Sequence, residues 1–445
     1  MKIRLIYPKF IKYLEDHPSL KESLKEHVVG DYTMPPSLAL PILAAITPPD
    51  IEVCLTDDNI AQEIDYGENV DLVAISCFTP QAQRAYEIAD NYKKRKTPVV
   101  IGGLHPSFRP REASEHVNSV CIGEGETLWH TIIEDAKNNS LQPSYRSKIS
   151  YNLEEAPIPK RSIFKKDIYR WDAHHVITSR GCPVRCIGCP LPEQEGHSFR
   201  FRPIQNIIED IKQMEYQEFY FIEDTLMLPG KKNQKYILNI MEHTRGLDVK
   251  IFLSSTMMMK HEYDFYTKLK QGGASSIYTV FGFDRVSKQL LSKECTKNEW
   301  QKGIDLVRMV EDNGIHFFAS FGIGFDDQDR SIVDKILKFS DDAGIDLAEF
   351  YILTPFPGTP FGIQAEKEKR ILHRNYSLWN HGNVVFKPFL WTEEELINDF
   401  YTLWKEFYKN KNPQETTRTF NLCSLEELTK GTKLVSKGHK SLRSS

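Results

Sequence analysis

The first third of the chain alternates short apolar runs with amphipathic stretches. Between two of these runs, residues 81–94 place three alanines and Ile88 at helical spacing. The apolar, β-branched runs are 3–7, 51–55, 72–77, 99–101 and 119–122. Each is typical of a strand that is buried on both faces of a sheet. This alternation predicts a doubly wound parallel sheet, an α/β fold of the flavodoxin-like (Rossmann) type, over residues 1–140.

A strand–helix unit then recurs six times in the second half of the chain. The predicted strands are 175–178, 219–222, 250–253, 277–280, 316–320 and 349–353. The helical stretches that separate them are 204–216, 232–243, 262–271, 299–312 and 331–343. Six such units predict an open, TIM-like (β/α)6 partial barrel over residues 171–365, with its chemistry at the carboxyl ends of the strands.

Three further segments complete the predicted organisation. Residues 141–170 are rich in Pro, Ser and charge and are expected to link the two domains. Residues 366–430 are predicted as a C-terminal helical extension, in which Thr392 suits an N-cap and Glu395 completes a capping box. The tail at 431–445, where Gly, Lys and Ser prevail, is predicted to be disordered.

Composition is that of an ordinary globular enzyme, with 40% hydrophobic and 27% charged residues. A formal net charge of -4 gives no reason to expect nucleic acid or an anionic membrane as a partner. No signal peptide or long apolar run is present, and the eight irregularly spaced cysteines do not form a disulfide framework. The cytoplasm is therefore the expected compartment.

The candidate chemistry is concentrated in residues 180–190, where Cys182, Cys186 and Cys189 have the spacing C-x3-C-x2-C. Three thiolates on one loop can hold a four-iron cluster and leave one iron open to a ligand. A structural zinc site normally closes with four ligands, and no fourth Cys or His continues this run in zinc-finger spacing. Because the loop follows the first barrel strand, the cluster is expected at the catalytic rim.

The cysteine motif, with Gly196 and residues 199–203 downstream, resembles the radical S-adenosylmethionine superfamily. Residues 353–360, Leu-Thr-Pro-Phe-Pro-Gly-Thr-Pro, follow the sixth predicted strand and support the same resemblance. Because a flavodoxin-like domain precedes the barrel, the chain is similar to the cobalamin-binding branch of the superfamily, which includes methylases of unactivated carbon and anaerobic ring cyclases. The resemblance covers roughly residues 1–395.

The resemblance implies a role for each cluster cysteine and for the strand ends of the barrel. Cys182, Cys186 and Cys189 would ligate a [4Fe-4S] cluster whose open iron binds S-adenosylmethionine. Reduction of the sulfonium would release methionine and a 5′-deoxyadenosyl radical, although the residues that act on the substrate itself cannot be named. The residues expected near S-adenosylmethionine are Glu223, Ser254, Ser255, Asp284 and Phe199. For any one of them a solvated loop is an equally good interpretation.

Three loops beyond the strand ends of the first domain, 76–80, 102–106 and 123–126, are expected to meet cobalamin. Glycines there let the backbone approach a large flat ligand, although a plain tight turn explains a Gly-Gly pair equally well. The predicted cobalamin contacts are Phe78, Thr79, Gly102, Gly103, His105, Gly123, Glu124 and Gly125. The Asp-x-His-x-x-Gly motif of better-known cobalamin enzymes is absent from the sequence, so no protein histidine is expected on cobalt.

Two positions depart from the family pattern. The residue before the last cluster cysteine is usually aromatic and packs near adenine, whereas this chain has Gly188. Adenine would then need another wall, for which Phe199 and Ile323 are candidates. The fourth barrel strand usually ends in Gly-x-Glu-Ser, whereas this chain has Gly-Phe-Asp-Arg, in which Asp284 keeps the charge but shortens its reach.

The favoured function is a cobalamin-dependent methyltransferase acting on an unactivated carbon of a small molecule, with Tyr376 and Trp379 as candidate substrate contacts. Radical cyclisation or rearrangement, and transfer of another group such as aminocarboxypropyl, are the alternatives among enzymes. A non-catalytic iron–sulfur or cobalamin sensor is the alternative outside them. A flavodoxin or ferredoxin is the expected reducing partner.

Overall fold

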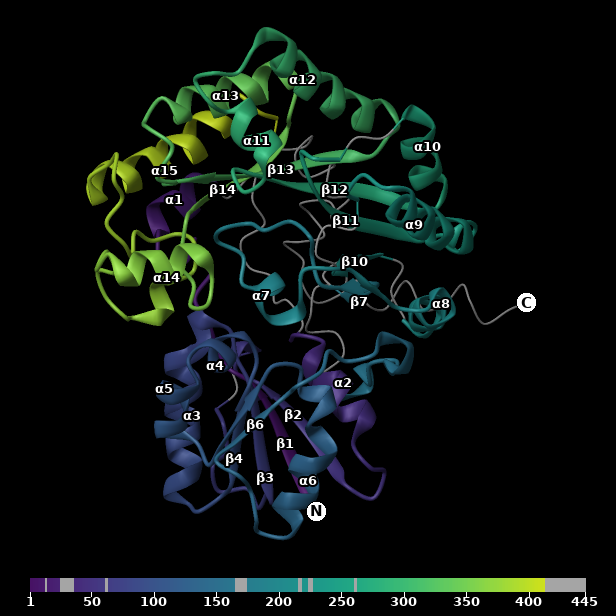
Figure 1. Ribbon diagram of the computed structural model, residues 1–445, viewed down its shortest axis with the longest axis vertical. Coiled ribbons are helices and arrows are strands. Elements are labelled where there is room, and N and C mark those ends of the chain that lie inside the picture. The colour runs from purple at the N-terminus through teal and green to yellow at the C-terminus, as the bar shows by residue number, and fades with distance from the viewer. Residues whose placement is uncertain are drawn as a thin grey trace.

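The computed structural model describes residues 1–12, 14–24, 36–60, 63–164, 174–214, 218–222, 227–259 and 262–412. Two parallel sheets, each with its own helices, lie one above the other in Figure 1. The first sheet and its helices form the lower half of that view, and the second sheet forms the upper half. No helix among the described residues is long and apolar enough to cross a membrane.

The first sheet has the strand order β2-β1-β3-β4-β5-β6, and all its pairings are parallel. This is the flavodoxin-like order with one strand added at the edge, so the predicted fold is confirmed. The strands are β1 (Lys2–Tyr7), β2 (Glu52–Asp57), β3 (Leu72–Ser76), β4 (Val99–Gly102), β5 (Ser119–Ile122) and β6 (Ser144–Arg146). The added strand β6 continues the sheet past the expected domain boundary at residue 140.

Helices cover both faces of this sheet, as Figure 1 shows. The helices α3 (Ala82–Lys94) and α5 (Pro110–His116) pack on one face, and α2 (Ala39–Ile46) and α6 (Trp129–Lys137) pack on the other. The alanines of α3 are fully buried, because a small side chain lets the helix lie close to the strands. Ser76 pairs in register with Gly102, so the loops after β3 and β4 begin at the same edge.

The second sheet is also parallel, and its order, β14-β13-β12-β11-β10-β7, follows the chain. Sequential parallel strands with helices on one side form an open partial barrel, as predicted. The strands are β7 (His175–Ile177), β10 (Glu218–Ile222), β11 (Lys250–Thr256), β12 (Ala274–Phe281), β13 (His316–Ile323) and β14 (Leu347–Ile352). The helices are α8 (Ile204–Gln213), α9 (Lys231–Thr244), α10 (Tyr263–Gln271), α11 (Arg285–Leu290), α12 (Lys297–Asp312) and α13 (Ile332–Ala343).

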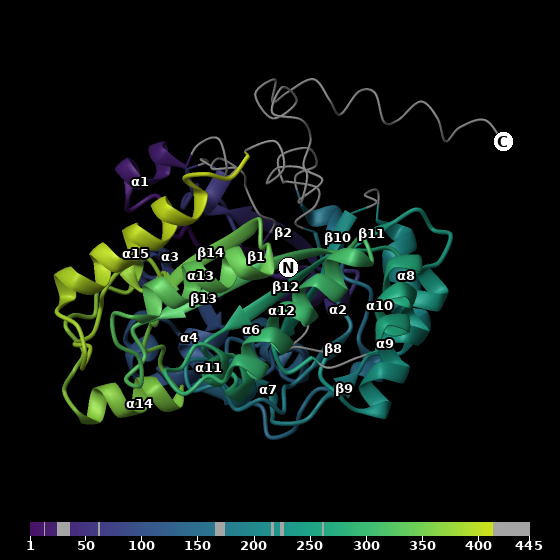
Figure 2. The ribbon, with the colours of Figure 1, turned by 90° about the horizontal axis from the view of Figure 1, so that it is seen from above.

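The C-terminal helix α15 (Glu393–Tyr408) begins with the predicted capping box. Thr392 Oγ1 accepts a hydrogen bond from the backbone N–H of Glu395, and the Glu395 carboxylate accepts one from the backbone N–H of Thr392. The helix packs beside α13 and against β14, as Figure 2 shows from above. Trp404 and Phe407 contact Phe350 edge-on. Its aromatic face therefore completes the outer helical layer beside β14, an edge strand of the second sheet.

Segments from the two ends of the chain connect the domains. The short helix α1 (Pro18–Ser23) follows the first strand, yet it lies beside α15 and contributes Leu20 to the core of the barrel. His17 holds it there through the backbone oxygen of Gly382 at 2.7 Å and the hydroxyl of Tyr401 at 2.8 Å. These contacts fix the two domains against each other.

Candidate functional site

The cysteine loop lies at the carboxyl end of β7, between the two-residue strand β8 (Ser179–Arg180) and helix α7 (Leu191–Glu195). β8 pairs with β9 (Arg200–Phe201), and this ribbon closes the base of the loop. A hydrogen bond from the backbone N–H of Cys182 to the oxygen of Gly196 adds to the closure. The predicted position of the motif at the catalytic rim is thus the observed one.

The three thiols of the loop are close enough to influence one another electrostatically. Burial raises the pKa of the Cys186 thiol, and the nearby Cys189 and Cys182 raise it further. No three Cys, His, Asp or Glu side chains in the described part of the chain converge tightly enough for a single metal ion. In a four-iron cluster each thiolate binds a different iron, so its ligands stand further apart than those of a mononuclear site. One short loop that brings the thiols of Cys182 and Cys189 near that of Cys186 fits such a cluster.

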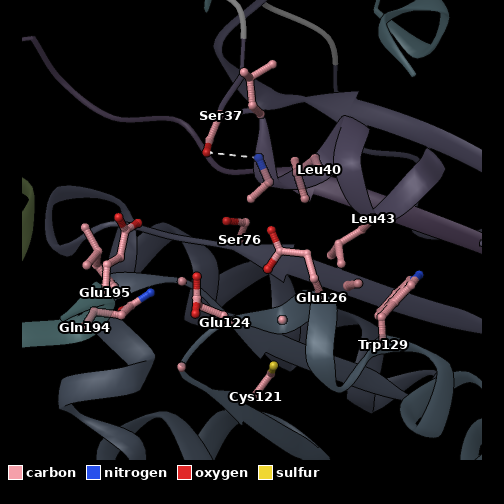
Figure 3. A pocket seen from close by; sticks show the side chains of 18 of the residues that line it. Ser37, Leu40, Leu43, Ser76, Cys121, Glu124, Glu126, Trp129, Gln194 and Glu195 are labelled. Carbon is pink, nitrogen blue, oxygen red and sulfur yellow. Dashed lines mark hydrogen bonds between the residues drawn. The ribbon is translucent and has the colours of Figure 1, made fainter. Parts of the chain in front are cut away.

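A large cleft lies between the segments that flank this loop and the carboxyl edge of the first sheet (Figure 3). It encloses about 1320 Å³, its open mouth included. Its walls come from α2, from the ends of β3, β4 and β5, from α6, and from the cysteine-loop side through β8 and α7. Its lining includes Ser37, Leu40, Leu43, Ser76, Phe78, Gly102, Gly103, Leu104, Cys121, Gly123, Glu124, Gly125, Glu126, Trp129, Arg180, Gln194 and Glu195.

A glycine in the cleft wall lets two backbone loops lie in close contact. Gly103 has φ of 103°, and a Cβ placed on it would lie 2.7 Å from the backbone oxygen of Cys77. A side chain at this position would therefore push apart the loops after β3 and β4. A wide cleft with glycine loops on one wall and apolar Leu40, Leu43 and Trp129 on the others fits a large flat ligand.

Ion pairs join the cysteine loop to the cleft. The Arg180 guanidinium donates to Glu124 at 2.7 Å and to Glu126 at 2.5 Å, and Arg200 donates to Glu124 at 3.1 Å. Burial alone would raise the pKa of Glu126, but Arg180 beside it holds that pKa below its ordinary value. The Glu126 carboxylate therefore stays charged. Its pair with Arg180, together with the pairs that Glu124 makes, ties the first domain to the strand that leads into Cys182.

Three comparisons place these features among known proteins. Residues 37–132 match the model of the B12 binding domain. An uncharacterized methyltransferase of Pyrococcus horikoshii is 28% identical over 92% of each chain. The bacteriochlorophyllide d C-8(2)-methyltransferase of Chlorobaculum tepidum is 27% identical over 83% of this chain and 86% of its own. The same fold occurs in the radical S-adenosylmethionine methyltransferase TsrM of Kitasatospora setae, whose structure has cobalamin and a [4Fe-4S] cluster bound. The TM-score is 0.60 and the sequence identity 15%, and the match covers 82% of this chain and 78% of that one.

The chain is therefore similar, over most of its length, to methyltransferases, and it shares its fold with a cobalamin-binding radical S-adenosylmethionine methyltransferase. The matched B12-binding residues include α2 and the strand ends that line the cleft. The cysteine loop lies outside that match, and the residues that flank it, Arg180 and Leu191, line the barrel side of the same cleft.

The space beside Gly188, for which the resemblance implied an aromatic residue, is filled by a residue that follows another strand. A Cβ on Gly188 would lie 2.8 Å from the ring of Phe283 and 3.0 Å from Leu353. Phe283 follows β12, and its ring stacks on Tyr351 at a centroid distance of 5.7 Å. A larger side chain at Gly188 would therefore displace the ring of Phe283.

The two residues expected to replace the missing aromatic lie elsewhere. The half-buried Phe199 ring stacks on Phe201 in β9, at a centroid distance of 5.8 Å. Ile323, at the end of β13, is fully buried in the barrel core. Phe283 is thus the aromatic residue that the structure places against Gly188.

The predicted S-adenosylmethionine contacts differ in their surroundings. Ser254 lies near the end of β11 and its hydroxyl bonds to Tyr220, while Ser255 is buried and donates to the backbone oxygen of Thr256. Asp284 caps α11 by accepting from the backbone N–H groups of Val286 and Ser287, and it is electrostatically coupled to Cys186. Asp284 is thus a buried N-cap residue rather than part of a solvated loop. Glu223 lies outside the described residues.

The predicted cobalamin contacts are largely brought together. Phe78, Gly102, Gly103, Gly123, Glu124 and Gly125 all line the cleft. Thr79 instead lines a neighbouring cavity and bonds to His105 at 3.2 Å. The His105 imidazole is buried against Tyr86 and Glu112, at 3.1 and 3.3 Å, rather than exposed in a polar loop. No histidine is among the described residues that line the cleft.

Both predicted substrate contacts lie in a buried core between the domains. Tyr376 donates to Glu112 at 3.0 Å and its ring lies edge-on to His105 at 4.7 Å. Trp379 packs on Tyr376 and is almost completely buried. These two side chains dock the C-terminal segment on the first domain, because each is surrounded by protein rather than by a cavity.

Sequence reasoning missed several of the residues that line the cleft. Arg180 directly precedes the motif, and a charged residue at the end of a buried strand is a signal that could have identified it. Its partner Glu126 was visible in the Gly-Glu-Gly-Glu loop. Leu40, Leu43 and Trp129 carry no such signal, because apolar residues on a helix are ordinarily core residues.

Proposed function

We propose that the chain is a cobalamin-dependent radical S-adenosylmethionine methyltransferase that methylates an unactivated carbon of a small molecule. One observation carries the proposal: Arg180 and Leu191, which flank the three-cysteine loop, line the same cleft as the strand ends of the domain that matches the B12-binding model. The names of the relatives, two of which are methyltransferases of bacteriochlorophyllide, support the same reaction.

Cys182, Cys186 and Cys189 would hold a [4Fe-4S] cluster, which when bound supplies an electron to the sulfonium of S-adenosylmethionine. The hydrogen bond from Cys182 N–H to Gly196 and the packing of Phe283 on Gly188 keep the loop in one conformation. Ser254 and Ser255, at the carboxyl end of β11, remain proposed contacts for S-adenosylmethionine.

The glycine loops, together with Phe78 and Glu124, would hold cobalamin, which when bound supplies a carrier for the methyl group. Because the described lining has no histidine, no imidazole of this chain is proposed as a cobalt ligand. The apolar side chains of α2 and α6 exclude water from the cleft. Arg180 orients the barrel rim toward this wall through Glu124 and Glu126.

The electron has to come from outside the chain, and a flavodoxin or ferredoxin is the proposed donor. Both carriers belong to reducing compartments, so the cytoplasm is the proposed location. A small-molecule acceptor is proposed, since the net charge of -4 offers no general attraction for nucleic acid.

Product analysis tests the proposed reaction. Protein reconstituted anaerobically with iron and sulfide is incubated with S-adenosylmethionine and a reductant, with and without cobalamin. We expect S-adenosylhomocysteine, the product left after methyl donation, to form only when cobalamin is present. 5′-Deoxyadenosine without S-adenosylhomocysteine would instead favour cyclisation or rearrangement, and 5′-methylthioadenosine would favour aminocarboxypropyl transfer. No cleavage product from protein carrying both cofactors, with a candidate acceptor present, would contradict the proposal.

A further inference from the structure

A second cavity lies beside the cleft, and aromatic rings dominate its walls. It encloses about 750 Å³, its open mouth included. The first domain contributes Tyr7 at the end of β1, Phe10 after it, the loop after β3, and helix α4 (Leu104–Phe108). The barrel domain contributes Pro190, which follows the last cysteine of the motif, and Phe356 and Pro357, which follow β14. We call this space the aromatic cavity.

The polar groups on its walls bond within the protein. The Gln81 amide donates to the backbone oxygen of Pro8 at 2.6 Å and accepts from the backbone N–H of Phe78 at 2.9 Å. The hydroxyl of Thr79 bonds to His105, and Tyr7 bonds to Gln81. Charged side chains do not occur among the described residues of the lining. A ligand that enters therefore meets ring faces and aliphatic carbons, and polar groups on it would lose water without gaining partners.

The aromatic cavity adjoins both parts of the candidate site. Phe78 and Leu104 line the aromatic cavity as well as the cleft, so these two side chains form the partition between them. Pro190 lines the aromatic cavity, and the next residue, Leu191, lines the cleft. A molecule in the aromatic cavity would consequently lie against the cysteine loop and next to the B12-binding wall.

We propose that the aromatic cavity binds the apolar, ring-containing part of the methyl acceptor. This inference rests on the proposed function for the identity of the ligand, and on the lining for its chemistry. S-Adenosylmethionine fits the lining poorly, because its adenine edge and charged methionyl group need hydrogen-bond partners that these walls do not offer. Cobalamin, with its peripheral amides, fits it poorly for the same reason.

Binding of the neutral naphthalene fluorophore prodan to the protein carrying both cofactors tests the inference. We expect saturable binding that weakens about tenfold or more in Phe10→Glu, because an unpaired carboxylate disfavours an apolar ligand beside it. Phe10 lines the aromatic cavity and not the cleft. Phe10→Leu, which keeps the wall apolar, should bind prodan nearly as well as the wild type. Phe389→Glu is the matched control, since Phe389 is 59% exposed and belongs to neither space.

Competition identifies the ligand class. 2-Acetylnaphthalene should displace prodan, and adenosine at the same concentration should not. Equal prodan affinity in the wild type and Phe10→Glu, or displacement by adenosine, would overturn the inference. Thermal unfolding of Phe10→Glu and Phe10→Leu shows whether a loss of binding is a loss of folding. Prodan binding needs no turnover. The protein could therefore form S-adenosylhomocysteine without binding prodan, or bind prodan without forming S-adenosylhomocysteine. The two experiments thus distinguish failure of this inference from failure of the proposed function.

Discussion

Replacing Cys186 by alanine is expected to abolish both the iron–sulfur absorbance of the reconstituted protein and its cleavage of S-adenosylmethionine. Cys186 is the thiol that the structure couples electrostatically to Cys182 and Cys189. Removing it leaves two ligands, and two thiolates on one loop do not retain a four-iron cluster. The measurement is the visible absorbance and iron content after anaerobic reconstitution, followed by quantification of the cleavage products.

The matched control is Cys54→Ala. Cys54 lies in β2, in the other domain, and its thiol contacts the backbone oxygen of Ile3. This variant should keep full iron content and full cleavage. Retention of the cluster in Cys186→Ala, with Cys54→Ala behaving as the wild type, would show that the motif is not the cluster site.

Replacing Arg180 by methionine is expected to lower the stability of the protein by about 3–5 kcal/mol, because it leaves the buried carboxylate of Glu126 without its partner. Glu126 would lose its hydrogen-bonded guanidinium, while Glu124 would keep Arg200. The cleft wall that these residues fix should then loosen, and cobalamin affinity should fall with it. Urea unfolding of the apoprotein and absorbance titration with hydroxocobalamin measure the two effects.

A second substitution separates lost charge pairing from lost packing. In Arg180→Met combined with Glu126→Gln, the uncompensated charge is gone, so most of the lost stability should return. The double variant keeps the Glu124–Arg200 pair. If the double variant is as unstable as Arg180→Met, the ion pair is not what holds the barrel rim to the first domain.

Those parts of the fold that depend on local pattern could be predicted from the sequence. The strand at 119–122 coincides with β5, and the helix expected at 232–243 lies within α9. Buried parallel strands read as continuous apolar runs, and surface helices carry a 3.6-residue period, so both leave a signal within a short window. The cysteine loop could be predicted because all three ligands lie within one such window.

The rest depends on contacts between segments that are far apart in sequence. Tyr376 and Trp379 resemble exposed aromatics in a polar segment, yet Glu112 and His105 of the first domain bury them. Phe283 reaches Gly188 from a different strand, and α1 leaves its own domain to pack on α15. Such contacts leave no periodic pattern in the sequence. The residue that packs against Gly188 and the burial of His105 could therefore not be predicted from it.

The central claim is that one cleft places an iron–sulfur cluster and cobalamin opposite each other. Electron paramagnetic resonance of anaerobically reduced protein carrying both centres tests it most directly, because the interaction between two unpaired spins weakens steeply with their separation. We predict that the signals of the reduced cluster and of cobalt(II) are broadened or split when both are loaded, relative to protein loaded with either alone. A spectrum that is the plain sum of the two separate signals, at full occupancy of both centres, would contradict the claim.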